Sequence, residues 1–153
     1  MINTMEEQRT AREFKLTATI NEMPVAKITS SIDAINYVRK FYNDDIAIYE
    51  SAFILLIDRA NNTIGWAKIS QGGICGTVVD VRIVAKYAIE ALASSVIFVH
   101  NHPSGNVNPS VDDINIVQKL KVGLAVLDVK LLDSIIICQD EKKSYSFKDE
   151  GRL

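Results

Sequence analysis

Apolar residues recur along this chain at two spacings, one typical of strands and one typical of helices. Strict alternation of apolar and polar residues from Glu13 to Ile20 predicts a half-buried strand. Two longer apolar runs, 52–57 and 129–138, predict strands, and the first is expected to be covered on both faces. The Arg59-Ala60-Asn61-Asn62 turn predicts a hairpin, because asparagine tolerates positive φ. Further extended segments are predicted at 25–28 (a small strand or a connection), 64–70, 77–79, 96–100 and 145–147.

Helical spacing of apolar residues occurs three times. It predicts an amphipathic helix over 31–42, a second over 81–93 after the cap residue Asp80, and a third that starts at Ser110 and ends at Gly123. This order predicts a layered α/β (α+β) domain in which helices flank a mixed central sheet. Residues 1–12 are polar and unpatterned and predict a flexible N-terminus, which leaves 13–153 as a single domain.

The composition of the 153 residues is that of an ordinary soluble domain, with 48% hydrophobic residues and a formal net charge of −2. This charge supplies no basic surplus for non-specific DNA binding. The N-terminus is too polar for a signal peptide, and no apolar run approaches the ~20 residues of a membrane span. Cys75 and Cys138 lie in apolar surroundings and predict two buried, reduced thiols. We therefore expect a cytoplasmic protein without a membrane anchor; the sequence does not specify its oligomeric state.

The two histidines of the chain, His100 and His102, stand two positions apart at the end of a predicted strand. Side chains at i and i+2 of a strand point to the same face, so both imidazoles are expected on one side. Pro103 cannot continue the sheet and ends the strand there. Neutral imidazole is a favoured ligand of Zn²⁺, so the pair indicates a metal site. The alternative is two surface histidines that alternate by chance.

A third ligand is expected from the helix that follows, because the turn through 103–110 can bring its first residues back to the histidines. Ser110-x-x-Asp113 also has the form of a capping box, which would fix Asp113 on the first helical turn. Spacing alone does not choose between Asp112 and Asp113, although the third helical position favours Asp113. Two histidines and one carboxylate would leave a fourth position of a zinc ion open for water, as in catalytic sites.

These residues resemble a known signature: His-x-His, seven residues, then Ser-x-x-Asp is similar to the motif of the JAB1/MPN+ (JAMM) metalloprotease superfamily. The string from His100 to Gly105, followed by Pro109 and Ser110, resembles the RadC branch of that superfamily. The resemblance extends from about Glu50 to the C-terminus. It implies a cytidine-deaminase-like JAB/MPN fold.

The same resemblance implies roles for individual residues. His100, His102 and Asp113 would bind Zn²⁺. Glu50 would be the general acid/base that takes a proton from the attacking water, and Ser110 would donate a hydrogen bond to the developing oxyanion. Without the resemblance, Glu50 reads as a solvated glutamate at the start of a strand.

The expected function is a zinc-dependent hydrolase of the peptidase/isopeptidase class that acts on a peptide or isopeptide substrate. The alternatives are a RadC-type protein of DNA repair or recombination that acts as a binding module, and a DNA-processing metalloenzyme. Two departures from the RadC pattern are expected to matter. Asp133-Ser134 stands where RadC proteins often have Asp-His, and the sequence before Glu50 has no room for a helix-hairpin-helix region.

Overall fold

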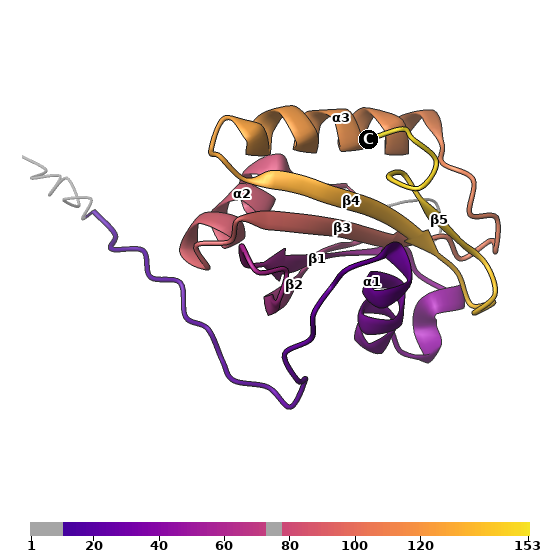
Figure 1. The fold of residues 1–153 in the computed structure, drawn as a ribbon, viewed down its shortest axis with the longest axis horizontal. Coiled ribbons are helices and arrows are strands. Elements are labelled where there is room, and N and C mark those ends of the chain that lie inside the picture. Colours follow the sequence, from indigo (N-terminus) through magenta and orange to yellow (C-terminus); the bar gives the residue numbers. More distant parts are fainter. Residues whose placement is uncertain (1–10, 73–77) are drawn as a thin grey trace, which may run out of the picture.

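The computed structural model describes residues 11–72 and 78–153, and within them five strands form one mixed sheet (Figure 1). The strand order is β2-β1-β3-β4-β5, with β3 and β4 parallel and all other neighbours antiparallel. All seven residues of β1 are buried, which confirms a strand covered on both faces. The strands are β1 Ser51–Ile57, β2 Thr63–Gln71, β3 Ser95–Asn101, β4 Lys130–Ile137 and β5 Ser144–Ser146.

Helices cover both faces of the sheet, as the order of elements predicted. One face carries α1 (Ser31–Val38), and the other carries α2 (Val81–Glu90) and α3 (Val111–Ala125) (Figure 1). Two short 3₁₀ helices, Arg39–Phe41 and Asp44–Ala47, lead from α1 to β1. None of the helices in the described ranges is long and apolar enough to span a bilayer.

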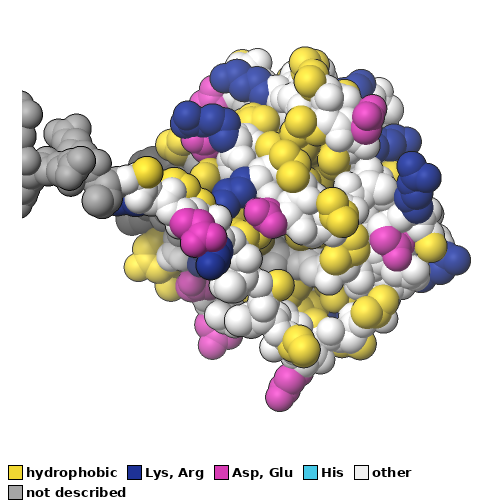
Figure 2. All heavy atoms as spheres, turned by 90° about the vertical axis from the view of Figure 1, so that its left-hand side faces the viewer, with side chains coloured by type: hydrophobic (Ala, Val, Ile, Leu, Met, Phe, Trp, Pro, Cys, Tyr) yellow, Lys and Arg dark blue, Asp and Glu magenta, His cyan; other side chains and the backbone are white. Residues whose placement is uncertain are grey.

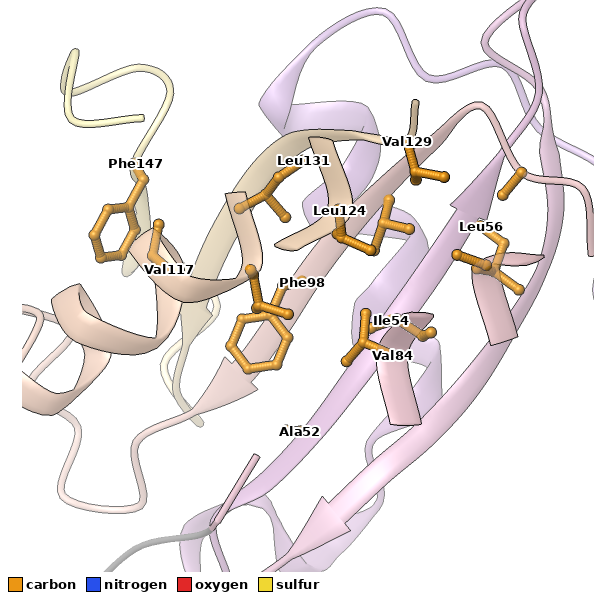
Figure 3. Close-up of a cluster of buried hydrophobic side chains, with 14 of the residues drawn as sticks. Ala52, Ile54, Leu56, Val84, Phe98, Val117, Leu124, Val129, Leu131 and Phe147 are labelled. Atoms are coloured by element: carbon orange, nitrogen blue, oxygen red, sulfur yellow. The ribbon is translucent and has the colours of Figure 1, made fainter. Parts of the chain in front are cut away.

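The buried side chains form two layers, one on each face of the sheet. The layer beneath α2 and α3 includes Val96 and Phe98 of β3, and Figure 3 shows Phe98 among the side chains of this layer. The layer beneath α1 takes the alternate residues of the same strand, Ile97 and Val99. Successive side chains of a strand point to opposite faces of the sheet. The remaining residues of β3 therefore continue to alternate between the two layers.

Figure 2 shows the end of the molecule that lies on the left in Figure 1, where the turns after α2 and α3 meet the surface. Exposed apolar side chains are visible on this face (Figure 2). In the turns after α2 and α3, Leu92 and Val126 are 87% and 80% exposed. No histidine is visible on this face (Figure 2). The histidines and carboxylates that the sequence predicts as a metal site lie toward the other end of the strands.

The strand predicted from Glu13 to Ile20 is wrong. This segment has no regular structure, and Phe14 and Ile20 are 84% and 103% exposed. A single bridge between Lys27 and Asn62 is all that forms from the short extended segment predicted at 25–28. Pro24 lies between this bridge and residue 20 in the sequence, and because proline has no N–H it cannot donate to a ladder that would continue toward residue 20. An alternating pattern therefore forms a strand only where the backbone can also pair with a neighbouring strand.

Two other predictions concern residues next to or inside the undescribed gap. Of the extended segment at 77–79, Thr77 lies outside the described residues, and Val78 and Val79 have no regular structure. Cys75 also lies outside them, whereas Cys138 is free and buried as predicted. The hairpin turn is confirmed, because Asn61 has a φ of 64°.

The predicted end of the third helix at Gly123 is wrong, since α3 continues to Ala125. The glycine serves a different purpose. A Cβ placed on Gly123 would come within 3.0 Å of Cγ1 of Val81, at the start of α2. The residue therefore permits a close approach of two helices, which a single sequence cannot distinguish from a helix end.

We expect the Gly123→Leu variant to lower the free energy of unfolding by up to about 2 kcal/mol, measured by urea denaturation. Overpacking typically costs about 1–3 kcal/mol, and leucine's better helix propensity offsets up to about 1 kcal/mol of that cost. Val122→Leu is the control, because Val122 is 65% exposed on the same helix. That change should stay within about 0.5 kcal/mol. Equal stability of the two variants would contradict the role given to Gly123.

Candidate metal centre

The two histidines meet at the end of β3, as the i, i+2 spacing predicted. His100 is the penultimate residue of β3, and the His102 N–H donates to the carbonyl of Ile137, which extends the pairing with β4. His100 points to the same face as Phe98, beneath α3, and is only 2% exposed. The Nε2 atoms of the two imidazoles lie 3.1 Å apart.

The third group is the carboxylate of Asp113, which the start of α3 holds in place. Ser110 caps the helix through the predicted capping box: its hydroxyl accepts from the Asp113 N–H (3.1 Å), and its own N–H donates to Oδ2 of Asp113 (2.6 Å). Oδ1 of Asp113 lies 3.0 Å from Nε2 of His100, and Oδ2 lies 3.4 Å from Nε2 of His102. Asp112 is exposed and outside this cluster, so the structure brings Asp113 to the histidines.

The fourth group is Glu50, which immediately precedes β1. β1 runs antiparallel to β3, with Ala52 opposite His100, so the start of one strand lies beside the end of the other. Ligand atoms of Glu50, His100, His102 and Asp113 all lie within 4.8 Å of one another. The pairing of β1 with β3 brings Glu50 to His100, which is 50 positions away in the sequence.

The charges of these groups influence one another. Burial raises the pKa of Glu50, and the carboxylate of Asp113 adds to this, while the two histidines partly oppose it; the net shift is upward. Burial also acts to raise the pKa of Asp113, but hydrogen bonds with His100 and His102 outweigh it, so the net pKa is strongly lowered. Asp113 is therefore an anion, and Glu50 is a carboxyl group that holds a proton more readily than an exposed glutamate.

The donor atoms fit a divalent metal ion. The Nδ1–H of His102 donates to the carbonyl of Asn106 (2.7 Å), so in neutral His102 the lone pair is on Nε2 and faces the cluster. Nε2 of His100 faces the same point. Two imidazole nitrogens and an anionic oxygen converging in this way repel one another unless a proton or a cation lies between them. Imidazole and carboxylate are the ligand types that Zn²⁺ accepts in catalytic sites.

The cluster lies at the bottom of an open cleft of about 700 Å³. Ser110 lines this cleft, and the hydrogen of its hydroxyl is not used in the bond with the Asp113 N–H. The sequence analysis missed the apolar wall of the cleft, because apolar residues of a wall and of a core have the same pattern. The wall consists of Val78, Val79, Phe98 and Ile116.

Asp133 and Ser134, the departure from the RadC pattern, take no part in the cluster. Asp133 is buried on β4, where it accepts from Ser146 Oγ (2.6 Å) and from the N–H groups of Ser134 (2.7 Å) and Lys148 (3.1 Å). These hydrogen bonds connect β4 to the C-terminal segment. Ser134 is fully buried, and among the described residues its hydroxyl has no hydrogen-bond partner.

Asp133→Asn is expected to change how stability depends on pH. Burial raises the pKa of Asp133, despite the hydrogen bonds that lower it. Between the ordinary carboxyl pKa and this raised value the folded state binds more protons than the unfolded one, so the contribution of Asp133 to the free energy of unfolding falls as pH rises. The variant should thus gain stability relative to the original protein across that window. Urea denaturation at a series of pH values measures the difference, with Glu141→Gln as an exposed control; a difference independent of pH would contradict the prediction.

Taken together, a mixed sheet between helices, with two imidazoles and two carboxylates at a strand end, defines an α+β domain with a candidate catalytic metal site. Comparison with known proteins agrees with this. The chain matches the model of the RadC-like JAB domain family over residues 28–152. It therefore belongs to the RadC-like JAB domain family, and the JAB domains are a metalloprotease superfamily.

Relatives of known sequence carry the name "UPF0758 protein". One from Flavobacterium johnsoniae is 43% identical over 129 residues, which are 84% of this chain and 55% of that protein. Another from Porphyromonas gingivalis is 37% identical over 133 residues, 86% of this chain and 57% of that protein. A third, from Clostridium perfringens, is 33% identical over 132 residues, which are 85% of this chain and 56% of that protein. The chain thus spans little more than half the length of these relatives, and their name states no activity.

Proposed function

We propose that this protein is a zinc-dependent hydrolase of peptide or isopeptide bonds. The observation that carries the proposal is the convergence of Glu50, His100, His102 and Asp113 within 4.8 Å at the bottom of an open cleft. His100, His102 and Asp113 would hold the metal, because their side chains face one point. His100 lies on β3, Asp113 lies on α3, and the His102 N–H is bonded to the carbonyl of Ile137 on β4. Zinc at this point would act as a Lewis acid toward water and toward the carbonyl oxygen of a substrate.

Glu50 is the proton carrier in this proposal. Its carboxylate lies beside the ligands, but Glu50 directly precedes β1, whereas the histidines lie at the end of β3. A carboxylate oxygen of Glu50 would take a proton from the attacking water and deliver it to the nitrogen of the leaving amine. Its raised pKa suits the first half of this transfer, because a carboxylate with a higher proton affinity is a stronger base toward the attacking water.

Ser110 supplies the remaining polar group. Its hydroxyl hydrogen is free to donate to the carbonyl oxygen of the substrate, which becomes negative as water adds to the carbon. The apolar wall beside the cluster, including Phe98 and Ile116, limits the access of bulk water from that side. Both effects act where charge develops during bond cleavage.

The test combines metal removal with a search for cleaved bonds. The purified protein is stripped with a chelator, reloaded with Zn²⁺, and incubated with a peptide library that includes lysine-linked isopeptides, with products read by mass spectrometry. We expect about one zinc per chain and cleavage that disappears on stripping and returns on reloading. No bound zinc, or metal-dependent cleavage of DNA under the same conditions without any cleavage of peptides, would overturn the proposal.

A further inference from the structure

Asn101 lies between the two histidines in sequence but serves the other face of the sheet. His100 and His102 face the cluster beneath α3, and the alternation of β3 turns the intervening side chain toward the face that α1 covers. Asn101 is 0% exposed. A primary amide buried to this extent needs hydrogen-bond partners, because leaving it unpaired would be costly.

The partners of this amide all belong to the segment that carries Glu50. Oδ1 of Asn101 accepts from the N–H of Ser51 (2.7 Å), the residue directly after Glu50. Nδ2 donates to the carbonyls of Tyr49 (2.8 Å), directly before Glu50, and of Ile46 (2.6 Å). The three bonds fix the orientation of the amide, since only oxygen can accept from an N–H and only nitrogen can donate to the two carbonyls.

We infer that Asn101 is a positioning residue that sets the place of Glu50 relative to the metal ligands. The end of one strand would then serve two purposes. On one face it would hold the metal ligands, and on the other face it would hold the backbone before and after Glu50. This inference rests on the proposed function, because it gives Glu50 a task that depends on its distance from the metal. Asn101 itself touches neither metal nor substrate.

A merely structural role for Asn101 makes a different prediction. A buried amide that only supports the fold would, when removed, lower stability and disturb the ligands and Glu50 alike. A positioning role predicts that the segment 46–51 moves relative to the metal while the ligands, which have their own supports in β4 and α3, stay in place. The distance of each segment from a bound metal therefore separates the two roles.

The experiment uses Co²⁺ as a paramagnetic substitute for zinc in the full chain. Paramagnetic broadening of amide signals falls steeply with distance from the ion, and NMR measures it for each residue. In the original protein we expect strong broadening in both 46–51 and 110–113. In the Asn101→Ala variant, residues 46–51 should lose most of theirs, and 110–113 should keep it. Ile135→Val, a change in the same buried layer, is the control and should alter neither.

Hydrolysis provides a second reading. Asn101→Ala should lower kcat by about 10²-fold, the cost of a misplacement of roughly 1 Å, with KM and zinc affinity unchanged. Asn101→Asp keeps the size of the side chain and the acceptor for the Ser51 N–H but cannot donate to both carbonyls, and it replaces the alanine variant if that does not fold. Broadening in 46–51 that survives both substitutions would overturn the inference. An original protein without any Co²⁺-dependent broadening would instead overturn the proposed function.

Discussion

Replacing His100 by alanine is expected to lower the affinity of the protein for Zn²⁺ by more than about 10²-fold. Loss of a group that merely supports a ligand costs about 10–100-fold in metal affinity, so loss of a direct ligand should exceed that range. His100 is the most buried member of the cluster, and its Nε2 lies close to both other proposed ligands. Without it, one imidazole and one carboxylate would remain on the ligand side.

The measurement is a competition titration with a chromophoric chelator, supported by the zinc content of the purified variant. Asp112→Asn is the matched control. Asp112 lines the same cleft and is the neighbour of Asp113, yet it is outside the cluster. Loss of its charge should change the zinc affinity much less than the loss of His100. Equal affinities of the His100→Ala variant and the original protein would show that the ligand set is different from the one proposed.

Glu50→Gln is expected to lower kcat by about 10²–10⁴-fold, the usual contribution of a general acid/base, while the zinc content stays at the original level. Glutamine has nearly the size of glutamate but cannot accept the proton of the attacking water. Because Glu50 is the one cluster member outside the proposed ligand set, its loss should separate catalysis from metal binding.

The measurement pairs kinetics on a cleaved peptide with zinc analysis of the same preparation. Asp112→Asn again removes one negative charge from the cleft and serves as the control for a purely electrostatic effect. Its kcat should stay close to that of the original protein. A Glu50→Gln variant that loses zinc together with activity would instead identify Glu50 as a ligand.

The sequence pattern correctly predicted those strands, helices and caps that depend mainly on residues close together in the chain. The five strands of the sheet and the three helices follow from spacing and caps, and the capping box correctly placed Asp113 at the third helical position. The predicted α+β fold with a mixed central sheet is confirmed as well. The errors concern contacts that are distant in sequence: the segment 13–20 does not pair with the outer edge of β2, and Gly123 approaches Val81 of another helix.

The residues of the candidate site also differ in how far the local sequence predicts their positions. The positions of His100, His102 and Asp113 relative to one another could be worked out from one strand, one turn and one helix cap. Glu50 was nominated by resemblance alone, because its position depends on the pairing of β1 with β3. The contacts of Asn101 had no signal in the sequence at all, since an asparagine between two histidines gives no indication of the backbone it binds.

During folding, the proposed metal ligands can come together before Glu50 reaches them. His100 and Asp113 are 13 positions apart, whereas Glu50 is 50 positions from His100. Closing the longer loop costs about 1 kcal/mol more in chain entropy, and it requires the non-local β1–β3 ladder. A nascent or partly unfolded chain can therefore assemble the ligands before the acid/base arrives. In the proposed mechanism, metal capture would then precede catalytic competence.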